Sequence, residues 1–147
     1  MKRFVTVFLM LLIATALFAQ DKTENVLFNG TWIAHFQNFL SQIILFDNGY
    51  YERSWSNDKI WETGTYIAIN GMITFTPVQI SSDTLTQTQL EPNTLYSADD
   101  LREYYSEQAI QVYFETMTFK YSLTGNSLIL DFNDKGVRSS ETYTKMN

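Results

Sequence analysis

Hydrophobic and polar residues alternate in two similar stretches, YIAINGMITF at residues 66–75 and YSLTGNSLIL at residues 121–130. Alternation with a period of two is typical of a β-strand with one buried face. In the first stretch, Asn70-Gly71 predicts a two-residue type I′ turn, because that turn needs positive φ at both central positions. The first stretch is therefore predicted to be a β-hairpin. The residues that share its buried face are Tyr66, Ala68, Ile73 and Phe75.

The second stretch centres on Gly125-Asn126, where a leading glycine suits a type II′ turn. Tyr121 then faces Leu130 across the hairpin, on a face that is apolar along both strands. The opposite face is polar, with Ile129 as its one apolar exception. A strand pair with one buried and one solvated face is typical of an antiparallel sheet. The two stretches therefore predict two hairpins of the same sheet.

The same alternation extends over most of the chain. It predicts eight strands, at about residues 31–36, 42–46, 50–55, 60–69, 72–78, 115–124, 127–132 and 137–146. The turn at residues 47–49 can contain two or three residues, and its length decides whether Tyr50 or Tyr51 points inward. Eight antiparallel strands joined in sequence most simply close into an up-and-down β-barrel, which leaves no exposed edge. We therefore predict an all-β fold, an eight-stranded antiparallel up-and-down β-barrel.

A different pattern separates the fifth and sixth predicted strands. Residues 79–94 are rich in Ser, Thr and Gln and predict a loop. Ser97, followed by two acidic residues, is a helix-start signal, and apolar residues then recur at helical spacing over about residues 98–111. One helix is thus inserted between strands five and six. An insertion of this length is typical of a lid or a binding surface, with Leu101 and Tyr105 as the lid residues.

The first residues predict a secretory signal peptide. Lys2 and Arg3 precede an apolar run at residues 4–18, which small and then polar residues follow. The run is shorter than the roughly 20 apolar residues that span a bilayer, so a membrane anchor is the weaker interpretation. Cleavage after Ala19 is preferred and cleavage after Ala16 is the alternative. We expect residues 1–19 to be removed, and residues 20–147 to form one domain of an exported, periplasmic or extracellular protein.

The composition and charge of the chain bear on how its fold is stabilised and on which partners it can bind. The chain contains no cysteine, so no disulfide supports the fold, but 16% of its residues are aromatic, and aromatic rings bury much apolar area. Without Lys2 and Arg3, 8 basic residues remain against 16 acidic residues. This negative charge disfavours nucleic acids and anionic membranes as partners. The protein is also not expected to be an integral membrane protein.

Several short motifs resemble a known family. NGTW at residues 29–32 is similar to the Gly-x-Trp signature of lipocalins. ETGTYIAINGMITFTP, YSLTGNSLILDF and the closing YTKM resemble the lipocalin-like domains of secreted bacterial proteins, over roughly residues 29–146. The resemblance implies a barrel and a C-terminal arginine stacked on Trp32, for which Arg138 is the nearest candidate and Lys145 a weaker one. The Thr-Asp-Tyr segment of lipocalins has no counterpart here. The main helix of lipocalins follows the last strand, whereas the helix predicted here follows the fifth strand.

The inward-facing aromatic residues are the candidates for lining a cavity. Trp32 could form the floor of a cavity or close one end of a filled barrel, since small eight-stranded barrels are often filled by side chains. Trp61 is predicted to lie outside. The residues predicted to line the cavity are Trp32, Trp55, Tyr66, Phe75, Phe119 and Tyr121.

No set of residues predicts catalysis, a cofactor or a metal. His35 is the only histidine, without a sequence motif that would supply partners for it. DFNDKG at residues 131–136 has Lys135 where a calcium loop needs an oxygen ligand, and Thr142 where it needs a glutamate. Glu52 and Glu62 could pair across neighbouring strands, but exposed strand carboxylates are far commoner than catalytic ones. We therefore expect a protein that is not an enzyme.

Two functions fit these observations. The leading hypothesis is a small exported barrel that binds an apolar or amphipathic small molecule in its interior. The alternative is a filled barrel that acts through its surface, as an envelope or protein-interaction module. The apolar residues Ile67, Ile69 and Met72 on the outer face of the first hairpin favour the alternative, because exposed apolar clusters often mark contact surfaces.

Overall fold

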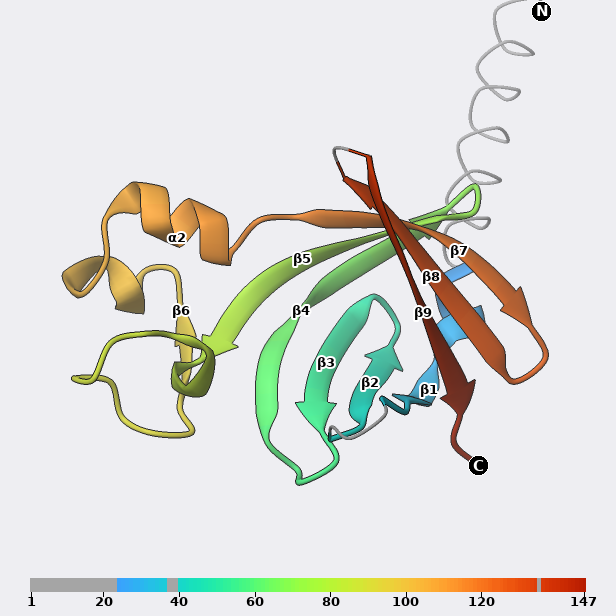
Figure 1. Cartoon of the computed structure of the whole chain (residues 1–147), viewed down its shortest axis with the longest axis horizontal. Coiled ribbons are helices and arrows are strands. Elements are labelled where there is room, and N and C mark those ends of the chain that lie inside the picture. The colour runs from blue at the N-terminus through green and yellow to red at the C-terminus, as the bar shows by residue number, and fades with distance from the viewer. Residues whose placement is uncertain (1–23, 37–39, 135) are drawn as a thin grey trace, which may run out of the picture.

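The computed structural model describes residues 24–36, 40–134 and 136–147, and the predicted signal peptide lies outside them. Eight antiparallel strands pair in sequence order, and the last strand pairs with the first, so the predicted up-and-down barrel is confirmed (Figure 1). Its strands are β1 (Gly30–Ala34), β2 (Gln42–Asp47), β3 (Tyr50–Trp55), β4 (Ile60–Ile69), β5 (Met72–Ser81), β7 (Met117–Thr124), β8 (Ser127–Asp134) and β9 (Val137–Lys145).

The turns form as their residues predict. Asn70 and Gly71 both have positive φ, 53° and 75°, and they join a hairpin in which Ile69 pairs with Met72. Gly125 has a φ of 57°, which places a glycine first in the second turn as predicted. The turn after β2 contains two residues, because Asp47 pairs directly with the first residue of β3.

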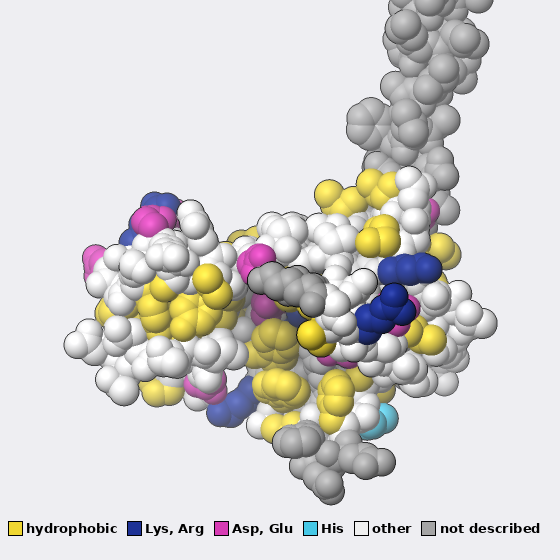
Figure 2. All heavy atoms as spheres, turned by 45° about the horizontal axis from the view of Figure 1, so that its top comes forward, with side chains coloured by type: hydrophobic (Ala, Val, Ile, Leu, Met, Phe, Trp, Pro, Cys, Tyr) yellow, Lys and Arg dark blue, Asp and Glu magenta, His cyan; other side chains and the backbone are white. Residues whose placement is uncertain are grey.

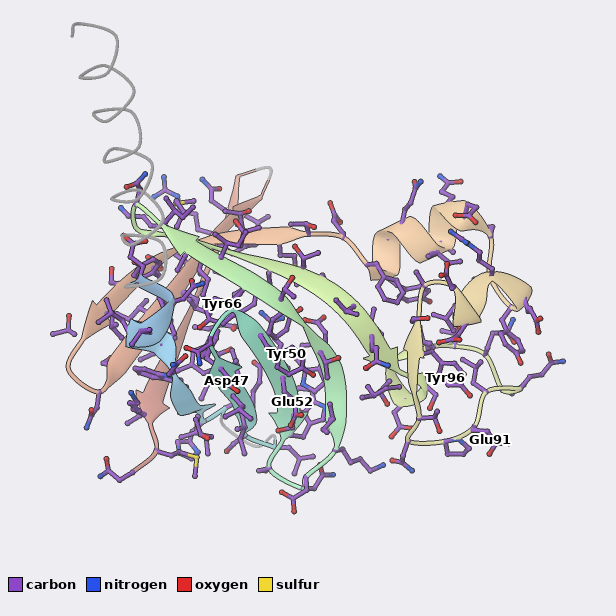
Figure 3. The ribbon with its side chains drawn as sticks, turned by 180° about the vertical axis from the view of Figure 1, so that it is seen from behind. Asp47, Tyr50, Glu52, Tyr66, Glu91 and Tyr96 are labelled. Carbon is purple, nitrogen blue, oxygen red and sulfur yellow. The ribbon has the colours of Figure 1, made fainter. Side chains whose placement is uncertain are left out.

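This two-residue turn decides which tyrosine enters the barrel. Tyr51 is fully buried, whereas Tyr50 is 43% exposed on the outer face of β3. Figure 3 shows Tyr50 and Glu52 on this strand, and Tyr66 within the barrel. The alternative that the sequence left open is therefore resolved in favour of Tyr51.

One end of the barrel is plugged by aromatic residues and by the helical residues 24–28 that precede β1. Phe28 is fully buried and lies within 6.0 Å of the Phe46, Tyr66 and Tyr121 rings, measured between centroids. Asn25 fixes the helical residues to β4, since its main-chain oxygen accepts from the Tyr66 hydroxyl at 2.9 Å. Its side-chain oxygen accepts from the Ala68 N–H at 3.1 Å. This end of the barrel is closed.

The segment between β5 and β7 differs from the predicted single helix over residues 98–111. A short 3-10 helix, η1 (Ser82–Thr84), is followed by β6 (Leu95–Ser97), which pairs with the end of β5 and lengthens that strand beyond the prediction. A second 3-10 helix, η2 (Asp100–Glu103), and the helix α2 (Glu107–Tyr113) then follow. The insertion of one helix between the fifth and sixth barrel strands is confirmed, but its predicted extent was wrong, because Ser106 has extended backbone angles and caps the helix by accepting from the Ala109 N–H.

This inserted segment has a hydrophobic core of its own, distinct from the barrel interior. The buried residues of the inserted core are Ile80, Leu85, Leu90, Leu101 and Ile110. Figure 1 shows the segment beside the barrel, at the far end of β5, and Figure 3 shows Glu91 and Tyr96 within it. The Lys59 ammonium lies 3.1 Å from the Asp83 carboxylate and joins the segment to the β3–β4 turn.

Candidate functional site at the open mouth of the barrel

Two neighbouring hollows lie at the end of the barrel opposite the aromatic plug. The outer hollow, of about 470 Å³, is lined by Phe36, Leu40, Gln42, Trp55 and Glu141. The inner hollow, of about 310 Å³, is lined by Gln42, Arg53, Trp61, Met117, Phe119, Phe132, Ser139 and Glu141. Because they share Gln42 and Glu141, we call them together the mouth. Figure 2 shows hydrophobic side chains gathered on this face, between the barrel and the inserted segment.

A β-bulge brings Trp61 into the mouth, although alternation predicts that it lies outside. Arg53 pairs with Glu62, but the next residue of β3, Ser54, pairs with Ile60, so Trp61 is the extra residue of β4. A bulge redirects side chains in this way because it disrupts the alternation locally. The Trp61 ring stacks on the Trp55 ring, with centroids 5.8 Å apart and planes 25° apart. The predicted outward position of Trp61 was therefore wrong.

The base of the inner hollow contains a buried charge pair. Arg53 Nη1 lies 3.4 Å from Glu62 Oε1, and both side chains are less than 8% exposed. The Tyr51 hydroxyl donates to the same carboxylate oxygen at 2.6 Å. Gly64 makes room for this tyrosine, because a Cβ atom there would approach its ring carbon and hydroxyl to 2.8 and 2.9 Å. A buried carboxylate thus has a cation and a hydroxyl as partners, as its burial requires.

Arg53 is surrounded by aromatic rings. Its guanidinium carbon lies 4.5 Å from the Phe75 ring centroid and 5.4 Å from that of Trp61, which is within the range of cation–π attraction. Two N–H groups of this cluster, Arg53 Nε and Trp61 Nε1, are buried and donate to no group among the described residues. Both side chains line the inner hollow.

A second polar group lies on the other wall of the mouth. The Tyr143 hydroxyl donates to Glu141 at 2.6 Å, and its oxygen lies 3.0 Å from the side-chain oxygen assigned to Gln42. A hydroxyl has one proton, so the Gln42 contact is satisfied when that amide is turned and its nitrogen donates. Tyr143 is fully buried, whereas Glu141 is partly exposed to the mouth. Glu141 therefore remains accessible from the mouth.

Burial shifts the ionisation of both tyrosines. Desolvation raises the pKa of Tyr51 far above its ordinary value, and the nearby Glu62 carboxylate raises it further. Desolvation also raises the pKa of Tyr143, and Glu141 adds to the shift. Each hydroxyl consequently stays protonated, and remains a hydrogen-bond donor, at alkaline pH values where an exposed tyrosine ionises.

The residues predicted to line a cavity divide between the two ends of the barrel. Trp55 lines the outer hollow and Phe119 the inner hollow. Tyr121 contacts Phe28 in the plug, and Phe75 lies below Arg53. The others belong to the buried core at the closed end: Trp32 and Tyr66.

Trp32 is held at the closed end by two interactions. Its indole N–H donates to the Phe28 carbonyl at 2.7 Å, and the Lys145 ammonium lies 5.4 Å from its ring centroid. The cation on the Trp32 ring is therefore Lys145 and not the expected Arg138. Gly30 leaves the space for this contact, since a Cβ there would approach Lys145 Cε to 3.0 Å.

The two predicted lid residues lie in the inserted core. Leu101 is fully buried there, and Tyr105 packs against the same core and contacts Tyr113 with ring centroids 5.4 Å apart. Val112, which follows these residues at helical spacing in the sequence, is 67% exposed. Neither lid residue lines the mouth.

The polar residues of the mouth were not predicted from the sequence, although one pattern in it indicates them. Tyr51, Arg53 and Trp55 occupy alternate positions of β3, so the inward face of that strand carries an arginine between two aromatic residues. Glu62 lies four residues before Tyr66 on β4, so the two side chains belong to the same face of that strand. A charged residue at an inward position of each of two neighbouring strands indicates a buried pair.

No family model, curated protein or solved structure matches this chain. Within residues 24–36, 40–134 and 136–147, no group of three or more His, Cys, Asp or Glu side chains could hold a metal ion. No helix within the same residues is long and apolar enough to cross a membrane.

Proposed function

We propose that this protein is a binding module and not an enzyme, and that it takes an amphipathic small molecule at the mouth of its barrel. The single observation that carries this proposal is the combination of apolar walls and unsatisfied polar groups in the same hollows. Ligand sites in proteins are concave, mostly apolar and supplied with a few placed polar groups. Because aromatic residues fill the closed end, the ligand occupies the mouth and not the whole interior.

The mouth offers the two kinds of contact that an amphipathic molecule needs. Phe36, Leu40 and Trp55 form the apolar lining of the outer hollow, where a chain or ring would lose contact with water. The polar groups at the base of the inner hollow would receive the head of the molecule.

Uptake of the uncharged dye N-phenylnaphthylamine tests this proposal, because its fluorescence rises in apolar surroundings. We expect saturable binding to the wild type. Ser139→Trp, which adds a large ring on the inward face of β9, should weaken binding at least about tenfold. Thr142→Trp places the same ring on the outward face of β9 and should leave binding unchanged. Absence of saturable binding to the wild type, or equal loss in both variants, would contradict the proposal.

Export of the protein is part of the proposal. The basic residues Lys2 and Arg3, the apolar run at residues 4–18 and the small residues after it support secretion. We propose that residues 1–19 are removed and that the protein acts in the periplasm or outside the cell. Expression of the full chain in a secreting host, followed by N-terminal sequencing, should show that the chain begins at Gln20, or at Leu17 if cleavage follows Ala16. An uncleaved chain in the cytosol would contradict this.

Membership of the lipocalin-like group is likewise a proposal. The Lys145–Trp32 contact supports it, because the resemblance implies a C-terminal arginine stacked on the tryptophan of the first strand and Lys145 supplies a cation at that place. Fold kinship of this kind says nothing about the ligand, which has to be argued from the mouth.

A surface role is the second candidate function. Ile67, Ile69 and Met72 are 56%, 39% and 42% exposed on the outer face of the β4–β5 hairpin. Such a cluster favours contact with the apolar surface of another protein. Sedimentation analysis of the wild type and of Ile67→Thr tests whether this face drives association. Concentration-dependent association that is lost in the variant would favour the surface role, and a monomer at every concentration would count against self-association through this face.

A further inference from the structure

The two unsatisfied donors in the mouth identify the head group of the ligand. Resting on the proposed function, we propose that the mouth selects an uncharged amphipathic molecule whose polar head is a carbonyl-type acceptor. Arg53 Nε and Trp61 Nε1 would donate to this acceptor. Both nitrogens are buried without an acceptor among the described residues, and the side chains that carry them line the inner hollow. A buried donor without a partner is costly, so an acceptor delivered by a ligand gains more there than it would in water.

The contacts of Arg53 within the described residues leave its Nε without a partner. Nη1 lies against the Glu62 carboxylate, and the guanidinium plane lies near the Phe75 ring. Trp61 supplies the second donor because the bulge in β4 turns it into the mouth, where its ring also stacks on Trp55. The two donors come from neighbouring strands, and one carbonyl oxygen has two lone pairs with which to accept from both.

The charge balance of the mouth favours an uncharged head over an anionic one. The Arg53 charge is already matched by the Glu62 carboxylate at 3.4 Å. Glu141 adds a second carboxylate to the lining. The residues that line the inner hollow, or pair with its lining, thus include two carboxylates, Glu62 and Glu141, and one cation, Arg53. An anionic head would meet this excess of negative charge, and like charges in a desolvated site repel strongly.

Glu141 and Gln42 also explain why an amide suits the site better than a simple ketone or ester. Both residues line the inner and the outer hollow. They offer acceptor oxygens and, from Gln42, an amide group, whereas Arg53 and Trp61 offer only donors. A primary amide presents an N–H donor next to its carbonyl acceptor, so it can satisfy donors and acceptors of the mouth together.

Three probes with the same alkyl chain test the head group: decanamide, decanoate and decylammonium, each competing with N-phenylnaphthylamine below micellar concentrations. We expect decanamide to bind at least about tenfold more tightly than either charged probe. Trp61→Phe keeps a ring but removes the indole N–H, and should weaken decanamide binding about two- to tenfold more than it weakens dye binding. Trp55→Phe, the matched control on the neighbouring ring, should leave the preference for decanamide intact.

The outcomes separate this inference from the proposed function. If the dye does not bind the wild type at all, the proposed function fails. If the dye binds but decanoate or decylammonium competes as well as decanamide, the head-group inference fails and the binding module stands. Equal losses of decanamide binding in Trp61→Phe and Trp55→Phe would also overturn the inference, because ring size and not the N–H would then account for the effect.

Discussion

The Tyr51 hydroxyl lies 2.6 Å from Glu62 Oε1, on the neighbouring strand and inside the barrel. This hydrogen bond marks the boundary between the two parts of the interior. On one side are the packed aromatic rings of the closed end, and on the other is the mouth, with Arg53 at its base. A polar layer thus separates a filled core from the open mouth.

Gly64 is predicted to be essential for this layer. A Cβ atom at residue 64 would press on the Tyr51 ring and on the Thr76 carbonyl of β5. Gly64→Ala should therefore lower the free energy of unfolding by about 1–3 kcal/mol, the usual cost of overpacking. Thr65→Ala, the exposed neighbour on the opposite face, should change it by less than about 0.5 kcal/mol. Urea titration measures both, and similar values for the two variants would contradict the assigned facing of β4.

The Arg53–Glu62 pair should behave as a buried pair whose members depend on each other. Arg53→Met leaves the Glu62 carboxylate buried without its cation and should cost about 3–5 kcal/mol of unfolding free energy. The double variant Arg53→Met with Glu62→Gln removes the uncompensated charge and keeps an acceptor for Tyr51, so it should be more stable than the single variant. Denaturant titration compares them. A double variant that is less stable than Arg53→Met would show that the pair is not coupled in this way.

Alkaline pH should destabilise the barrel through Tyr51 and Tyr143. Burial raises the pKa of both hydroxyls above the ordinary 10.0, so the folded state keeps protons that the unfolded chain releases. Their contribution to stability is complete below about pH 10 and is lost as the pH rises further. Tyrosinate absorbance should show that these two of the nine tyrosines ionise only on unfolding.

Tyr51→Phe isolates this effect. The variant should show a smaller decline of unfolding free energy above pH 10 than the wild type, because it lacks one of the two most strongly shifted hydroxyls. Tyr50→Phe, which alters an exposed tyrosine next to it, should leave the decline unchanged. Identical pH profiles in the wild type and Tyr51→Phe would refute the assignment.

The role of the inserted segment can be tested at Leu101, which is fully buried in the inserted core. Leu101→Asp places a charge among apolar side chains and should open this segment, as seen by faster hydrogen exchange over residues 82–114. The barrel should keep its slow exchange, because its core is a separate cluster. Dye binding should also persist, since the lining residues of the mouth come from the barrel strands and the β1–β2 connection. Increased dye uptake would instead support a lid role for Leu101 and Tyr105.

The barrel itself was predictable because strand alternation and turn residues act locally. Asn70-Gly71 and Gly125-Asn126 determine their hairpins through backbone conformations that few other residues adopt, and the paired registers follow from them. The length of the turn before Tyr50 could not be decided locally. It depends on how β2 and β3 pair, which in turn depends on burying Tyr51 in the closed barrel.

The mouth was harder to predict because it depends on a departure from regular alternation. The bulge opposite Arg53 reverses the face of β4 on which Trp61 lies, and no turn residue in the sequence marks the bulge. The divided helix of the inserted segment has a similar cause, since Ser106 caps a new helix where periodicity alone predicts continuation. The candidate lining residues Trp55 and Phe119 were found because they obey the alternation, and Arg53 was missed because an inward charge was not expected there.

The most direct test of binding at the mouth is an NMR titration that follows the indole N–H signals of the three tryptophans. Decanamide should shift the signals of Trp61 and Trp55, which line the mouth. The signal of Trp32 should stay in place, because Trp32 is buried at the closed end and its N–H is hydrogen-bonded to the Phe28 carbonyl. A shift confined to Trp32, or no saturable shift of any of the three signals, would contradict a ligand site at the mouth.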